Sequence, residues 1–95
     1  ISYIFQYKIP KQKGKGRLSF DFYLSDYNLC IEYHGRQHYE PIEFFGGIKS
    51  FKKQRENDYK KEKYCLDNNI GLLIVPYWEF DNIENILEQT LSRLG

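Results

Sequence analysis

Apolar and polar positions alternate along two short segments, residues 18–24 and 29–33, and the turn-forming residues 25–28 join them. Alternation with a period of two is typical of a strand with one buried face, and so short a link joins antiparallel neighbours. The pattern therefore predicts a β-hairpin. Residues 2–8 also alternate and predict a further strand, which a charged, glycine-containing connection over residues 11–17 follows.

The second half of the chain contains two helical patterns and one continuous apolar run. Residues 51–68 are rich in Lys, Glu and Arg with apolar positions near helical spacing, which predicts one long helix with Ser50 as its N-cap. Residues 71–76 are continuously apolar and predict a central strand buried on both faces. Residues 81–94 predict a second helix, with Asp81 and Glu84 as a capping box. The expected fold is α/β with the order βββαβα.

Length and composition indicate one globular domain. The chain has 95 residues, of which 41% are hydrophobic and 28% charged, and no apolar run is long enough to span a membrane. The start shows no signal-peptide pattern and no Met, so we expect an intracellular protein and a piece of a longer chain. Cys30 and Cys65 lack metal-ligand spacing and are expected as reduced core thiols.

The net charge of +1 conceals alternating blocks of charge. Residues 1–20 hold five Lys or Arg and no acid, and residues 49–63 hold seven Lys or Arg against three acids. The stretches 21–48 and 64–95 are each acidic by four charges. Two basic blocks around an acidic one would suit a polyanion laid across a metal-binding centre, although charge runs are more often plain solvated surface.

Two acids lie inside the apolar strands of the predicted hairpin. Asp21 and Glu32 each stand four residues from the turn, so the hairpin would place them side by side. Adjacent carboxylates repel each other unless a divalent cation or a proton intervenes, and such a pair favours Mg²⁺ or Mn²⁺ over Zn²⁺. The alternative is that both acids point outward and pair with Lys or Arg.

Both histidines of the chain, His34 and His38, directly follow this strand. A single histidine is more often structural, but two beside two embedded acids indicate a site. They could bind a metal, act as a general base or protonate a leaving group. The alternative for His38 is packing under Tyr39 and Phe44 to fix the loop.

One stretch of the chain carries a family resemblance. The run is FDFYLSDYNLCIEYHGRQHYEPIEFFGG, followed by the basic helix with NDYKK and then GLLIVPYW. It resembles the PD-(D/E)XK nuclease superfamily, most closely the branch of very short patch repair endonucleases and EDxHD phage intron-encoded homing endonucleases. The resemblance implies a restriction-endonuclease-like mixed sheet flanked by helices. It also implies that residues 1–95 form a single nuclease catalytic domain at the C-terminal end of a longer chain, with the first family helix upstream.

The resemblance assigns catalytic roles by position. Asp21 and Glu32 match the metal-binding acids, and His34 stands where the superfamily usually has Lys. His38 matches the second histidine of the branch, Asp58 matches its last acid, and Gln37 lies in the matching QH pair.

The implied activity is Mg²⁺-dependent hydrolysis of double-stranded DNA, with Mn²⁺ as a possible substitute and a homodimer for cutting both strands. Basic residues would hold backbone phosphates without reading bases. The expected contacts are Lys11, Lys13, Lys15, Arg17, Arg36, Lys52, Lys53, Lys60 and Lys61. The competing hypothesis is a nucleic-acid-binding module that keeps the fold without the activity.

Overall fold

The computed structural model describes residues 4–8 and 18–94, with four strands and two α-helices in them. The elements are β1 (Ile4–Lys8), β2 (Ser19–Leu24), β3 (Leu29–His34), α1 (Gly47–Asp67), β4 (Gly71–Pro76) and α2 (Ile83–Leu94). Their order confirms the predicted α/β arrangement βββαβα. The predicted connection over residues 11–17 lies outside the described residues.

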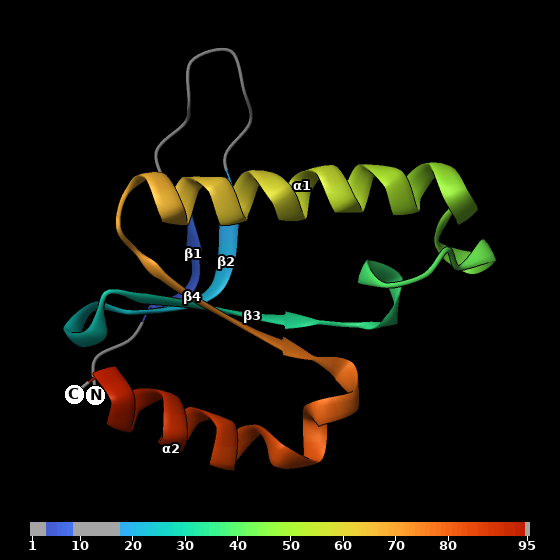
Figure 1. The fold of residues 1–95 in the computed structure, drawn as a ribbon. Coiled ribbons are helices and arrows are strands. Elements are labelled where there is room, and N and C mark those ends of the chain that lie inside the picture. Colours follow the sequence, from blue (N-terminus) through green and yellow to red (C-terminus); the bar gives the residue numbers. More distant parts are fainter. Residues whose placement is uncertain (1–3, 9–17, 95) are drawn as a thin grey trace.

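The strands form one mixed sheet in the order β1-β2-β3-β4. β2 pairs antiparallel with β1 and β3, and β4 pairs parallel with β3 in register from Leu29–Gly71 to His34–Pro76. A parallel pair needs a long crossover, and α1 provides it. Figure 1 shows α1 along one face of the sheet and α2 along the other, so helices flank the sheet as expected.

The face of β3 that lies under α1 begins apolar and becomes polar along the strand. Cys30 packs with Phe20 of β2 and Cys65 of α1 in the core beneath α1, and all three are at most 1% exposed. Glu32 and His34 follow Cys30 at steps of two, so a strand of period two presents them toward α1 as well. The dry core and the polar residues therefore share one strand and one face.

Two local predictions are wrong. Among the described strands, β4 lies at the edge of the sheet and pairs with β3 alone, so it is not the central strand that its apolar run indicated. A helix lies on each side of the sheet, but Val75 is the one residue of β4 that is fully buried, so the predicted burial on both faces is only partial. The long helix begins at Gly47 rather than after Ser50, because Gly46 takes a left-handed conformation (φ 99°) after the 3-10 turn Glu43–Phe45 and becomes the N-cap.

The hairpin follows the prediction closely, whereas Asp81 is not the N-cap of the last helix as predicted, because it lies inside a 3-10 segment. A 3-10 turn, Ser25–Tyr27, and Asn28 at φ 49° link β2 to β3. A longer 3-10 segment, Tyr77–Asn82, leads into α2, so the regular helix begins after Asp81. Within the described ranges, neither helix is long and apolar enough to cross a membrane.

Candidate active site

Two ionisable side chains of β3 are buried under α1. Glu32 is 4% exposed and His34 is 5% exposed. Removing such groups from water is costly unless partners compensate, and apolar side chains would pack the same space more cheaply. Glu32 and His34 are therefore candidates for functional residues.

His38 joins them from the 3-10 turn Arg36–His38, which follows β3 directly. Its Nδ1 lies 2.9 and 3.1 Å from the two carboxylate oxygens of Asp58 on α1. A carboxylate only accepts hydrogen bonds, so Nδ1 carries the proton and Nε2 is left for other partners. Gln54 Nε2, one turn earlier on α1, donates to Asp58 Oδ1 at 3.0 Å and fixes that carboxylate from the other side.

The two imidazole rings stack on each other. Their centroids are 3.8 Å apart and their planes differ by 11°. Burial, reinforced by the neighbouring His38, lowers the pKa of His34 to about 4, and Asp58 opposes this only in part. His34 is therefore neutral at physiological pH. Its Nε2 lies 3.9 Å from Glu32 Oε2 and 4.0 Å from Asp58 Oδ1, beyond ordinary hydrogen-bond length.

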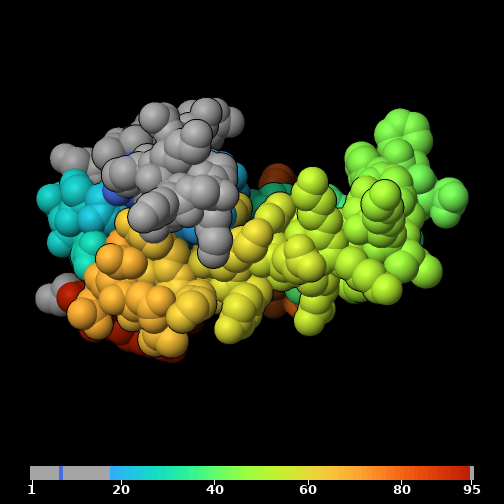
Figure 2. All heavy atoms as spheres, turned by 90° about the horizontal axis from the view of Figure 1, so that it is seen from above, coloured from blue at the N-terminus to red at the C-terminus, as the bar shows by residue number. Residues whose placement is uncertain are grey.

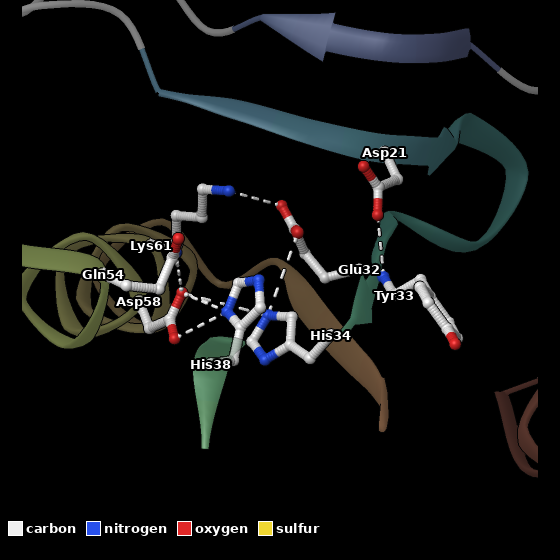
Figure 3. A network of polar contacts seen from close by, with 8 residues as sticks. All are labelled: Asp21, Glu32, Tyr33, His34, His38, Gln54, Asp58 and Lys61. Atoms are coloured by element: carbon white, nitrogen blue, oxygen red, sulfur yellow. Dashed lines mark hydrogen bonds and ion pairs between the residues drawn. The ribbon is translucent and has the colours of Figure 1, made fainter. Parts of the chain in front are cut away.

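Glu32 finds its partner on α1. Lys61 Nζ donates to Glu32 Oε1 at 2.8 Å, one helical turn beyond Asp58 (Figure 3). Burial raises the pKa of Glu32, the ammonium of Lys61 opposes the rise, and the charge of Asp21 adds to it. Glu32 is thus a carboxylate whose ionised form depends on a nearby cation.

Asp21 lies beside Glu32 but turns to a different partner. The pairing of β2 with β3 extends to Phe22–Ile31, so Asp21 comes next to Glu32 where that ladder ends. Its Oδ2 accepts a 2.7 Å hydrogen bond from the backbone N–H of Tyr33 and so continues the contact between the strands with a side chain. In Figure 3 the carboxylate of Asp21 faces Tyr33, whereas that of Glu32 faces Lys61.

Two groups of side chains near β3 could bind a divalent cation. Among the described residues, the group of three or more donors close enough to share an ion is His34, His38 and Asp58, with ligand atoms within 4.8 Å of one another. Histidine lone pairs lie in the ring plane, so two parallel rings do not aim at one ion unless one ring turns. The carboxylates of Asp21 and Glu32 are the hard oxygen donors that Mg²⁺ and Mn²⁺ prefer, and their mutual repulsion would be relieved by such an ion.

A cavity of about 270 Å³ opens beside the histidines. Its lining includes His34, His38, Tyr39 and Asp58, together with Arg55 and Tyr59 of α1. It gives a small charged group access to both imidazoles. Arg55 places a positive charge at its wall.

The remaining predicted residues lie outside this cluster. Gln37 is exposed and lines a separate hollow against the start of α1, and Arg36 is exposed with its guanidinium on Glu40. Of the predicted phosphate contacts on α1, three are exposed and Lys61 faces inward to Glu32: the exposed ones are Lys52, Lys53 and Lys60. The others lie outside the described residues, namely Lys11, Lys13, Lys15 and Arg17.

The sequence did not indicate that Gln54 and Lys61 belong to the cluster, although it named Lys61 as a phosphate contact. Gln54 supports Asp58, and Lys61 neutralises Glu32 rather than facing solvent. The signal was spacing, because residues 51, 54, 58, 61 and 65 follow the alternating steps of three and four that mark one helix face. Polar members of an inward stripe indicate a buried polar site.

Comparison with known proteins finds relatives in viruses. The chain is 38% identical over 92 residues to uncharacterized protein 307L of Invertebrate iridescent virus 6, covering 93% of the chain and 46% of that protein. It is 41% identical over 76 residues to uncharacterized protein 094L of Frog virus 3 (isolate Goorha), covering 78% of the chain and 48% of that protein. The chain thus spans about half the length of these relatives. No family model and no solved structure matches it.

Proposed function

We propose that this chain is the catalytic domain of a metal-dependent DNA endonuclease with a restriction-endonuclease-like fold. The observation that carries the proposal is the buried cluster of Glu32, His34, His38 and Asp58 between β3 and α1. These are residues that the nuclease resemblance singles out, and α1 brings Asp58 to the three that lie on β3 and in the turn after it.

The histidines suit different tasks. Asp58 holds Nδ1 of His38, so Nε2 can take a proton from water or give one to a leaving oxygen. His34 stays neutral at physiological pH because burial lowers its pKa to about 4. Its stacked ring therefore positions His38 and accepts hydrogen bonds without adding a competing positive charge.

The carboxylates of Glu32 and Asp21 would hold the cation. When bound, it supplies Lewis-acid polarisation of the scissile phosphate and activation of a water. Glu32 offers a buried, oriented oxygen, and Asp21 offers one anchored by the Tyr33 N–H. The exposed lysines of α1 attract the phosphate backbone.

Single-turnover cleavage of supercoiled plasmid with Mg²⁺ or Mn²⁺ tests the proposal. General acid-base catalysis is worth roughly 10²–10⁴ in rate, so His38→Ala is expected to slow cleavage by that order while DNA affinity changes little. Asp58→Asn is expected to slow it as well, because His38 loses the negative charge that orients its ring and stabilises its protonated form. Asp67→Asn is the matched control, since it makes the same change on the same helix at an exposed pair with Lys63.

Wild-type cleavage rates in His38→Ala would remove His38 from the chemistry. DNA binding without cleavage by the wild-type chain under either metal would favour the inactive nucleic-acid-binding module instead. The ratio of nicked to linear product would show whether two copies act together. Clustering of the cuts at one sequence would support the homing-endonuclease form of the proposal.

A further inference from the structure

We propose that Lys61 is a resident counter-ion that occupies the cation position on Glu32 and must leave it before a divalent metal binds there. The inference rests on the metal dependence in the proposed function. In it, the ammonium of Lys61 competes with the metal ion for the carboxylate of Glu32. It also changes the role of Lys61, which the sequence pattern had placed among the surface phosphate contacts.

The contact itself is short and sheltered. Lys61 Nζ lies 2.8 Å from Glu32 Oε1, and the two side chains are 17% and 5% exposed. The ammonium also lies 5.7 Å from the ring centroid of Phe20, which is fully buried. An ion pair so enclosed is stronger than a surface pair, because little water screens it.

Geometry makes the ammonium and a metal ion mutually exclusive. An oxygen that accepts a hydrogen bond from an ammonium at 2.8 Å cannot bind Mg²⁺ at about 2.1 Å through the same lone pair without strong repulsion between the two cations. The other oxygen of Glu32 faces His34 at 3.9 Å, in the direction of the imidazole cluster. An ion bound at Oε1 of Glu32 therefore requires that Lys61 move.

Lys61 has room to withdraw. Its four-carbon side chain starts on α1 and is itself 17% exposed, so one side of it already meets solvent. A rotation about the side-chain bonds can carry the ammonium from Glu32 toward solvent beside α1, the helix that runs along this side of the molecule in Figure 2. The helix itself need not move.

Mn²⁺ affinity, measured by the electron paramagnetic resonance of free Mn²⁺ at pH 8, tests the competition. Lys61→Met removes the competing charge and keeps a side chain of similar length, so we expect binding to tighten about tenfold or more. Lys60→Met removes the same charge from the exposed neighbour and is expected to change affinity less than about twofold, as a general field effect. Unchanged affinity in Lys61→Met would overturn the proposal.

A second measurement uses the wild-type chain and does not depend on the stability of a variant. Acetylation of lysines by an amine-specific reagent, read by mass spectrometry, should modify Lys61 slowly without metal and several-fold faster with saturating Mg²⁺. The rate at Lys60 should not change. Equal protection of Lys61 with and without Mg²⁺ would show that it is not displaced.

The two proposals can fail separately. Tighter Mn²⁺ binding in Lys61→Met and exposure of Lys61 by Mg²⁺, without cleavage of any DNA, would support the counter-ion and remove the nuclease. Cleavage with metal binding that is indifferent to Lys61 would support the nuclease and remove the counter-ion. Absence of Mn²⁺ binding in both wild type and Lys61→Met would overturn the counter-ion proposal.

Discussion

At the scale of single residues, Asp21 shows how one side chain can serve structure and chemistry together. Its carboxylate accepts the Tyr33 N–H at 2.7 Å where the β2–β3 ladder ends, and its charge also opposes ionisation of Glu32. The hydrogen bond stabilises the fold, and the repulsion destabilises it. Which effect is larger decides how substitutions behave.

Asp21→Ala is expected to lower the free energy of unfolding by about 1 kcal/mol without metal, because the Tyr33 N–H loses a charged acceptor and meets water instead. Asp21→Asn keeps an acceptor oxygen and should stay close to wild type in stability while losing metal-dependent cleavage. Urea denaturation in EDTA measures the first effect. An Asp21→Ala protein more stable than wild type would mean that repulsion from Glu32 dominates.

His34 makes stability depend on pH. Its pKa falls from 6.5 in the unfolded chain to about 4 in the fold, so between these values the unfolded chain binds more protons. Its contribution to stability is therefore present above pH 6.5 and is lost as pH falls toward 4, by on the order of 2–3 kcal/mol. Glu32 acts in the opposite sense, because its raised pKa favours the fold when the carboxyl is protonated.

The difference between wild type and His34→Phe isolates this contribution, since phenylalanine keeps a ring against His38 and cannot be protonated. Denaturation between pH 4 and 8 in EDTA should show the stability of His34→Phe gaining on wild type as pH falls through this window. A constant difference across that range would mean that His34 titrates normally in the fold.

At the scale of elements, alternation and helical spacing predicted most of the fold. The order βββαβα, the hairpin and the long helix follow from local periods of two and 3.6 residues. The edge position of β4 could not be predicted, because an apolar run records that helices cover a strand and not how many neighbours it pairs with. The start of α1 depended on the backbone conformation of Gly46, which residue type alone does not fix.

The sequence predicted several of the residues that cluster in the candidate site. It predicted less well which of them contact each other. Burial of Glu32 and His34 and the contact of His38 with Asp58 agree with the residues chosen from the sequence. Which cation neutralises which acid depends on how α1 is rotated against β3. That rotation brings Lys61 to Glu32, and the sequence offered many equivalent lysines.

At the scale of the whole molecule, the outward charge of α1 is smaller than the sequence suggests. Three of its predicted phosphate contacts, Lys52, Lys53 and Lys60, are exposed, whereas Lys61 is engaged inside. Each phosphate contact contributes about 0.9 to the slope of log affinity against log salt. We expect changing Lys52, Lys53 and Lys60 to Gln to reduce that slope by about 3, as measured by fluorescence anisotropy with duplex DNA.

Lys61→Gln is the comparison and should leave the salt slope nearly unchanged, because its ammonium is not available to phosphate in the free protein. A loss of about one unit of slope in Lys61→Gln would show instead that Lys61 reaches the backbone in the complex. An unchanged slope in the triple variant would place the phosphate contacts elsewhere on the chain.

The paired thiols of Cys30 and Cys65 join β3 to α1, the same two elements that hold the candidate site. Both are at most 1% exposed, and burial raises the pKa of Cys30 to about 12 and that of Cys65 in the same direction. Neither sulfur reaches an alkylating reagent, or forms thiolate readily, while the helix rests on the strand. The rate at which these thiols are alkylated therefore measures how often α1 moves away from the sheet. Each such opening also separates Asp58 and Lys61 on α1 from Glu32 and His34 on β3.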